Sequence, residues 1–410
     1  MDYKGIEYLR GRLAIKQPRV NLRYKFYDMK NITRDLGIST PPGLRHFFSV
    51  LGWNAKAVDS LADRLVFREF TDDLFDLNGI YNMNNKDVLF DSAILGALIG
   101  SCDFIYIHAD EAGNPLMQVI DGANATGIMD TVTGMLKEGY AVLERGEYGK
   151  PIVEAYFKPH ETWIFREGVE AAELYENIAP YPLLVPIVYR PDAKRPFGHS
   201  RISRACMELT ESAIRTLKRS EISAEFFSFP QRWVVGTSPD ADPLENWRVV
   251  MSSLLEITKD EDGQTPQLGQ FAQQSMTPHT EQLRMFASLF AGETGLTLDD
   301  MGFPTDNPSS AEAIKAAHEN LRLAARKAQR TFATGFLNAG FLGACIRDDY
   351  EYQRQQLYMT NAKWYPVFEP DAAALSSIGD GAIKINQAIN GYIDRENLYD
   401  LTGIKGGANG

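Results

Sequence analysis

The sequence predicts an α+β protein with several long helices, on the basis of three observations. The chain has 410 residues, of which 44% are hydrophobic and 23% charged, enough for two or three folding units with buried cores. Short alternating apolar segments, separated by turn residues, follow one another between residues 103 and 189. On both sides of this block, apolar residues recur every three or four positions, as they do in helices. Strands in one block with helices around it are typical of an α+β fold.

The predicted sheet lies in the N-terminal region, residues 1–200. A helix is expected at 86–100, where the apolar residues lean towards helical periodicity. Six strand candidates follow, and turn residues at 146–150 and 158–161 separate three of them. The candidates span residues 103–108, 114–120, 141–145, 151–157, 161–166 and 183–189.

Two long helices are predicted on either side of a small module. The first, within 201–230, has one apolar stripe and would be about 40 Å long. Ser200 is expected to cap it. The module, 231–275, has a strand candidate at 232–235 and a short helical piece near 244–254. The second helix, within 276–295, is expected to begin with Thr277 as its N-cap and a proline at its first position.

An acidic loop and a further long helix come next. The loop, 296–309, contains three aspartates and no Lys or Arg. Residues 309–312 read S-x-x-E, a capping box that predicts the start of the helix at 310–340. Its apolar stripe extends to residue 332, and its basic residues lie along another face. The C-terminal segment, 341–410, has a strand candidate at 362–368 and a helix candidate at 371–390.

Several classes of protein are disfavoured by what the sequence contains. The net charge of −12 argues against tight nucleic-acid binding, which needs many Lys and Arg contacts to phosphate. Residues 146–150 have neither the spacing nor the Ser or Thr of a phosphate-binding loop. Ser200 lacks the closing glycine of a nucleophile elbow. The six histidines are dispersed, and the pairs Asp299/Asp300 and Asp348/Asp349 are more typical of solvated loops than of a two-metal site. We therefore expect no enzyme, cofactor or metal.

The cysteines and the hydropathy restrict the class further. Cys102, Cys206 and Cys345 are too far apart for zinc spacing and are expected to be reduced, buried thiols. The N-terminus has no apolar run of the kind that a secretory signal needs, and no internal run is long enough to span a membrane.

Five segments, in this order and spacing, resemble the portal proteins of tailed bacteriophages, particularly those of siphophages. The resemblance covers about residues 86–404 and is sharpest over 198–336. The segments are GHSRISRACMELTESAIRTLKRSEISAEFF at 198–227, SFPQRWVVG and its continuation to 274, TPHTEQLRMFASLFAGETGLTLDDMGF at 277–303, TDNPSSAEAIKAAHENLRLAARKAQRTF at 305–332, and FEPDAAALSSIGDGAIKINQAINGYID at 368–394.

The resemblance implies a division of the chain into the parts of a portal subunit. The expected parts are an α+β wing at 1–200, a first stem helix at 201–230, a clip at 231–275, a second stem helix at 276–295, a tunnel loop at 296–309, a long wing helix at 310–340, and a C-terminal wing segment at 341–410 with a small or absent crown.

The resemblance also implies a function. Twelve subunits would form a ring at one capsid vertex, in the virion and earlier in the host cytoplasm during assembly. Double-stranded DNA would pass through it without sequence-specific contacts, driven in by the terminase and later ejected. The implied partners are the terminase large subunit, the head–tail adaptor and the major capsid or scaffolding protein, with no membrane.

Three sets of site residues follow from this resemblance. The channel loop would be lined by Thr297, Asp299, Asp300, Met301, Phe303, Asp306 and Asn307. The clip would bind partners through Trp233, Asp240, Asp242, Trp247, Asp260, Glu261 and Asp262. Taken alone, Trp247 is more typical of a core anchor than of an interface residue, and the acidic run at 260–262 is more typical of a solvated turn. The subunit interface would use Lys315, Glu319, Arg322, Arg326 and Arg330, of which Glu319 can pair with Lys315 and Arg322 within one helix.

Two other classes remain as alternatives. One is a different ring-forming component, such as a head–tail connector or capsid subunit, which the length and order of the segments disfavour. The other is a nucleic-acid enzyme, which the missing motifs disfavour. Imaging and mass measurement of the purified protein would discriminate between them.

Overall fold

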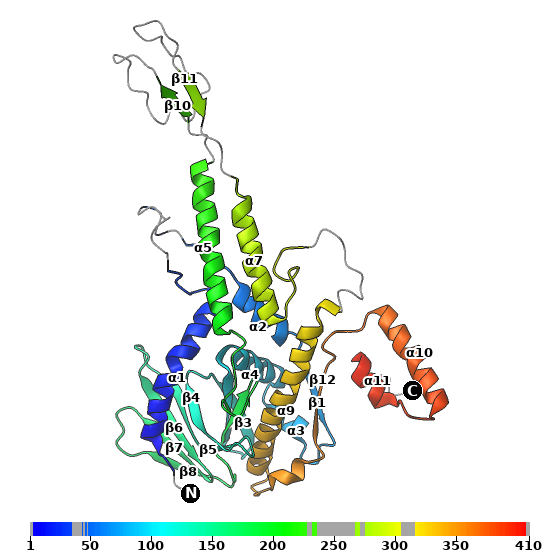
Figure 1. Cartoon of the computed structure of the whole chain (residues 1–410). Helices are drawn as coiled ribbons and strands as arrows, with labels where there is room; N and C mark the ends of the chain where they lie inside the picture. Colours follow the sequence, from blue (N-terminus) through cyan, green and yellow to red (C-terminus); the bar gives the residue numbers. More distant parts are fainter. Residues whose placement is uncertain are drawn as a thin grey trace.

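The computed structural model describes residues 3–34, 48–227, 232–235, 267–270, 275–304 and 316–406, together with Gly43 and His46. Its body mixes helices and strands, as predicted, and two long helices project from one end of it (Figure 1). The N-terminal part contains α1 (Ile6–Tyr27), α2 (Trp53–Ala62), β1 (Phe67–Thr71), α3 (Leu77–Met83) and α4 (Lys86–Gly100).

Two antiparallel sheets form the β-rich block. The first, in the order β3-β2-β9, contains β2 (Cys102–Ala109), β3 (Pro115–Ile120) and β9 (Leu184–Val188). The second, in the order β4-β5-β6-β7-β8, contains β4 (Ala125–Met129), β5 (Leu136–Arg145), β6 (Pro151–Lys158), β7 (Glu161–Arg166) and β8 (Glu173–Glu176). All six predicted strands are present, whereas β1, β4 and β8 were not predicted. Strand β8 is short, lies at a sheet edge and is mostly exposed, so it has no alternating pattern to detect.

The first sheet lies between the second sheet and a layer of helices. On one face, the rings of Tyr106 and Phe157 bring the two sheets together, with centroids 5.3 Å apart. The opposite face is covered by α4 and by α9 (Glu319–Arg347), whose residues Phe90 and Phe336 meet with ring centroids 4.3 Å apart. Both rings are fully buried, so this contact lies at the centre of the core.

Two ionisable side chains, the buried Asp103 and the half-buried Lys16, lie where α1 packs on the sheets. The carboxylate of Asp103 accepts a hydrogen bond from the backbone N–H of Gly122 at 2.9 Å, and Lys16 donates to the carbonyl of Ala125 at 3.2 Å. Burial raises the pKa of Asp103 and lowers the pKa of Lys16. Through these hydrogen bonds, the two side chains hold α1 in place against the sheets.

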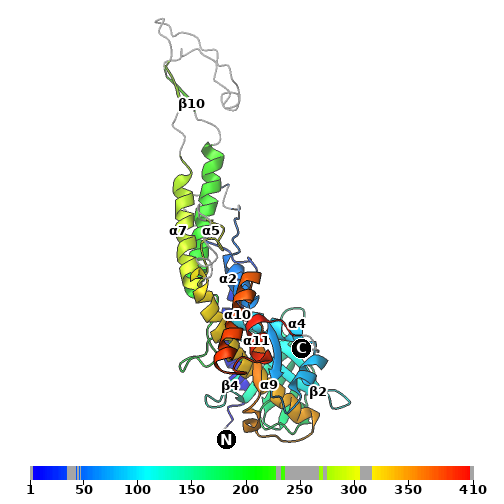
Figure 2. The same cartoon turned by 90° about the vertical axis from the view of Figure 1, so that its right-hand side faces the viewer.

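The projecting helices are α5 (Arg204–Phe227) and α7 (Thr277–Thr294), which lie side by side in two views (Figures 1 and 2). Beyond them, β10 (Arg232–Val235) pairs with β11 (Gln267–Gln270), so the predicted strand at 232–235 is confirmed. The predicted helical piece at 244–254 lies outside the described residues.

Both predicted caps of these helices were wrong. Ser203, not Ser200, accepts a hydrogen bond from the N–H of Cys206 at 3.1 Å, because α5 begins at Arg204. Thr277 is already helical, and its N–H donates to Ser275 Oγ at 3.2 Å. Ser200 is buried instead and bonds the carbonyl of Ile99 at 2.6 Å.

The C-terminal part begins with α9, which runs to Arg347 rather than ending near residue 340. The capping box predicted at 309–312 lies outside the described residues. After η2 (Arg354–Leu357), β12 (Asn361–Trp364) pairs antiparallel with β1, and it is shorter than the predicted strand at 362–368. Two helices follow, α10 (Ala372–Ala388) and α11 (Arg395–Thr402), and the first corresponds to the predicted helix at 371–390.

Candidate channel loop and assembly surfaces

The two projecting helices are joined to the body by a buried arginine. Arg201 donates from Nε to the carbonyl of Ala57 at 3.2 Å and from its terminal nitrogen to the carbonyl of Thr294. Along the helices, Thr216 of α5 donates to Gln282 of α7 at 3.1 Å. The base of both helices is thereby fixed to α2, so β10 and β11 are presented at a distance from the body.

Residues 296–304, the described part of the predicted channel loop, form a tight turn at the end of α7. The carboxylate of Asp300 accepts hydrogen bonds from the N–H and the hydroxyl of Thr297, both at 2.9 Å. It also lies 3.3 Å from Nε2 of His318, at the start of the next helix. Partial burial opposes the charged form of Asp300, but the bonds from Thr297 and His318 outweigh it and lower its pKa.

The apolar side chains of this turn pack inwards. Met301 is buried in the main core, with 7% of its surface exposed, and Phe303 packs partly buried against the same core. The assignment of Met301 to the channel lining is therefore corrected, because its side chain is covered within its own chain. Asp299 is exposed. Asp306 and Asn307 lie outside the described residues.

Helix α9 carries the predicted basic face. Glu319 and Arg322 form a two-point ion pair at 2.6 and 2.7 Å, which lowers the pKa of Glu319 and raises the pKa of Arg322. This pair lies within one helix, as the spacing predicted. Arg326 and Arg330 point away from the core and are exposed. Lys315 lies outside the described residues.

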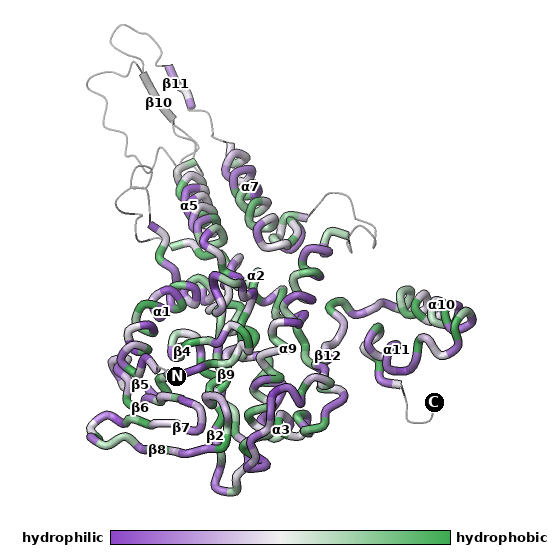
Figure 3. The backbone as a smooth tube through the Cα atoms, turned by 60° about the horizontal axis from the view of Figure 1, so that its bottom comes forward, coloured by the Kyte–Doolittle hydropathy of each residue, from purple (hydrophilic) through white to green (hydrophobic). Residues whose placement is uncertain are grey.

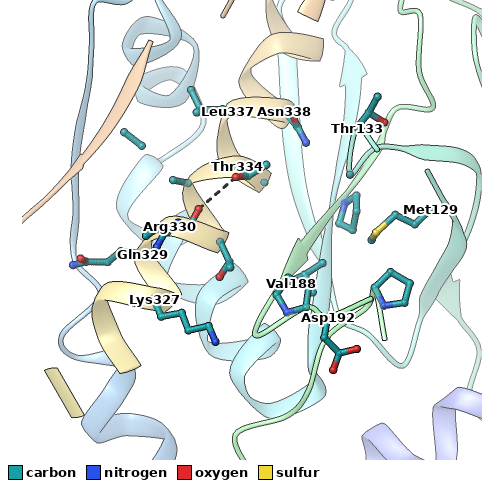
Figure 4. Close-up of a pocket in the computed structure, with 18 of the residues that line it drawn as sticks. Met129, Thr133, Val188, Asp192, Lys327, Gln329, Arg330, Thr334, Leu337 and Asn338 are labelled. Carbon is teal, nitrogen blue, oxygen red and sulfur yellow. Dashed lines mark hydrogen bonds between the residues drawn. The ribbon is translucent and has the colours of Figure 1, made fainter. Parts of the chain in front are cut away.

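A groove runs along this basic face, and we call it the α9 groove. It has a volume of about 1510 Å³ and lies between α9, the turn that joins β4 to β5, residues 186–196 and residues 360–364. Arg326, Lys327 and Arg330 line it from α9, and Asp192 lies on the opposite wall from Lys327 (Figure 4). Sequence reasoning missed Lys327, and it also missed the groove, because the walls come from segments more than a hundred residues apart.

The side chains of the predicted clip residues all lie outside the described part of the chain. Trp233 belongs to β10, but its side chain is outside the described part of the chain. The others, Asp240, Asp242, Trp247, Asp260, Glu261 and Asp262, lie outside the described residues.

The segment considered as a phosphate-binding loop is a turn between two strands. Residues 146–150 form the turn between β5 and β6, in which the N–H of Gly146 bonds the carbonyl of Lys150 at 2.9 Å. The described part of the chain holds no group of three or more His, Cys, Asp or Glu suited to a metal ion. None of the described helices is long and apolar enough to cross a membrane. All three cysteines are free thiols and buried, as predicted.

Comparison with known proteins agrees with this arrangement. The chain is 24% identical to the portal protein of Mycobacterium phage D29, over 93% of this chain and 82% of that protein. It is also 24% identical to the portal protein of Mycobacterium phage L5, over 90% of this chain and 79% of that protein. The resemblance to phage portal proteins is confirmed. The similarity to these portal proteins extends well beyond the segments at 198–336 and includes most of the N-terminal region.

No family model matches the sequence. Among solved structures, the chain is similar to one from the virion of a native gene transfer agent particle, with a TM-score of 0.46, 13% identity, and coverage of 94% of this chain and 99% of that one. A chain from the neck of a native gene transfer agent particle, computed with C12 symmetry, gives a TM-score of 0.45 at 14% identity, with the same coverage.

Proposed function

We propose that this chain is the subunit of a phage portal ring, through which double-stranded DNA enters the capsid and later leaves it. The observation that carries the proposal is the similarity to two portal proteins over at least 90% of the chain. The projecting pair α5 and α7, with β10 and β11 at its far end, supports the proposal (Figure 1). So extended a shape is unusual for a monomer and typical of a subunit that assembles with others.

The proposed parts follow the chain order. Residues 1–200 are the wing, α5 and α7 the stem, 231–275 the clip, 296–309 the tunnel loop, and α9 the wing helix. We infer that the clip binds the terminase during packaging and the head–tail adaptor afterwards, and that the ring itself hydrolyses nothing. In this proposal the subunits form a closed ring of twelve in the virion.

The proposed role of the tunnel loop depends on its charge. A sliding duplex is slowed by each cation that pairs with a phosphate, and this attraction weakens with salt. The loop has Asp299 and Asp306 and no Lys or Arg, so it would repel phosphate and keep the duplex centred. Asp300 contributes less to this effect, because its carboxylate is held by Thr297 and His318.

Imaging and mass measurement of the purified protein test the ring. Rings with a central hole are expected, and a monomer with nuclease or ATPase activity would overturn the proposal.

The charge of the loop is tested separately by Asp299→Lys combined with Asp306→Lys, in an assay of DNA packaged per particle. Slower packaging is expected, and the effect should diminish as salt is raised. Glu170→Lys, at an exposed turn between β7 and β8, is the matched control. Unchanged packaging and ejection in the double variant would contradict the role of the loop.

A further inference from the structure

The last two helices form an arm that has almost no core of its own. We call residues 371–404 the C-terminal arm; it lies to one side of the body in two views (Figures 1 and 3). Throughout this fully described stretch, Ala382 is the only buried hydrophobic residue. A unit of this size cannot support itself without burying apolar surface elsewhere. Its exposed large hydrophobic residues are Ile383, Ile385, Ile389, Tyr392, Leu401 and Ile404.

One ion-pair cluster fixes the arm to its own chain. Asp400 of α11 lies 2.7 Å from Arg68 of β1 and 2.5 Å from Lys363 of β12. The guanidinium of Arg68 also lies 3.8 Å from the centre of the Tyr399 ring. Helix α10 is joined to α11 by hydrogen bonds between Asn386 and the backbone of Ile393 at 2.7 and 2.8 Å. The arm is therefore anchored through α11, and α10 lies to one side of the body (Figure 3). Three isoleucines of this segment, Ile383, Ile385 and Ile389, are exposed.

The α9 groove has exposed apolar side chains and cations that the apolar and acidic residues of the arm could contact. Its apolar lining includes Leu323, which is 51% exposed, and Val132, which is 90% exposed. Within the described part of the chain, Arg326, Lys327 and Arg330 form no ion pair. In the described part of the chain, the Asp192 carboxylate on the opposite wall lies 2.6 Å from Nε2 of His199 and forms no ion pair with these three cations.

The arm and the groove match in length and in charge. Helix α10 has 17 residues and is about 25 Å long, and the stretch of α9 that lines the groove, residues 323–338, is about 24 Å long. The arm has five acidic residues (Asp371, Asp380, Asp394, Glu396 and Asp400) and two basic ones (Lys384 and Arg395), a net charge of −3. Asp380 and Ile383 are three residues apart on one face of α10, so an acidic and an apolar group can enter the groove together.

We propose that the C-terminal arm of one copy of this chain occupies the α9 groove of the adjacent copy. The contact is heterologous, with a different surface on each partner, so repeating it can close a ring. Within one chain, Asp400 holds α11 to Arg68 and Lys363, and α10 lies outside its own groove. Contact between two arms would instead bring two acidic segments together, although Asp400 and Glu396 are already paired with Arg68 and Lys363 of their own chain. The inference rests on the proposed ring and assigns a surface to the contact between neighbours.

Cysteine crosslinking tests this contact directly. The three native cysteines are buried, so new thiols at Ile383→Cys and Thr334→Cys would be the reactive ones. Thr334 is exposed and lines the groove. The assembled double variant is treated with a short bis-maleimide and separated under denaturing conditions. A ladder of covalent species larger than dimers is expected, because each chain would be linked to two neighbours.

The other outcomes each identify a different error. A crosslinked monomer would mean that the arm folds onto its own groove, and dimers from Ile383→Cys alone would mean that arms pack on arms. Rings seen by imaging without any ladder would overturn this inference and leave the proposed function intact. Protein that forms no ring at all would overturn the ring and this contact together.

A charge exchange gives independent support. Lys327→Glu should reduce the fraction of assembled rings, and adding Asp380→Lys should restore part of it, because the pair is re-formed with its signs reversed. Lys150→Glu, at the exposed turn between β5 and β6, is the matched control and should assemble normally. An equal loss with Lys150→Glu, or no recovery in the double variant, would contradict the contact.

Discussion

The two adjacent aspartates of the channel loop should respond differently to the same substitution. Asp300 accepts two hydrogen bonds from Thr297 and lies 3.3 Å from His318, whereas Asp299 is exposed. Hydrogen bonds to a charged group contribute about 1.5–3 kcal/mol each when buried. Because the side chain of Asp300 is 25% exposed, we expect Asp300→Ala to lower the free energy of unfolding by about 2 kcal/mol in all. Asp299→Ala should change it by less than about 0.5 kcal/mol.

Urea unfolding followed by tryptophan fluorescence measures both variants. The folded-state pKa of Asp300 is lowered, so its contribution is fully present above the unfolded-state pKa of about 4. It is lost as the pH falls through the lowered folded-state pKa, and the difference between wild type and Asp300→Ala should shrink in that range. Equal destabilisation by both substitutions, or a difference that grows in acid, would refute the structural role of Asp300.

Three further predictions concern the arm, the core and the thiols. Asp400→Asn should release the C-terminal arm and make it the first site of limited proteolysis, whereas Glu170→Gln, at the exposed turn between β7 and β8, should leave the cleavage pattern unchanged; identical patterns would contradict the anchor. Phe336→Ala should lower the free energy of unfolding by about 3–5 kcal/mol, measured in urea, and a loss under about 1 kcal/mol would be inconsistent with a central core position. The three cysteines should be unreactive towards a thiol reagent in the folded protein and all react in denaturant, because burial raises the pKa of each.

The C-terminal half of α9 shows why its end could not be predicted. Residues 333–347 contain three glycines, which disfavour a helix when only local propensity is considered. In the structure these glycines allow close packing: a Cβ at Gly335 would lie 2.7 Å from Ile187, and one at Gly343 would lie 2.9 Å from Met117. The helix continues because tertiary packing overrides propensity, and that packing involves strands far away in the sequence.

The channel loop was only partly predictable for a related reason. Its acidic character and its position after α7 can be read from the sequence, and so can the pairing of Glu319 with Arg322. The burial of Met301 and the fixed carboxylate of Asp300 cannot, because they depend on contacts with the core and with His318. The same holds for the α9 groove, whose walls meet only in the folded chain.

The distribution of cations connects the two proposals. Arg68 and Arg201 are buried and bonded within the chain, and Arg10 is paired with Glu154, so these cations are not available to DNA. If an acidic arm from the neighbouring copy neutralises Arg326 and Arg330, the cations of α9 are also removed from the channel. Assembly would then leave the passing duplex facing a loop without positive charge. Opening the α9 groove by deleting the arm should therefore increase the retention of DNA at low salt as well as weaken the ring. Weaker rings with unchanged DNA retention would separate the two effects and show that the cations of α9 never face the channel.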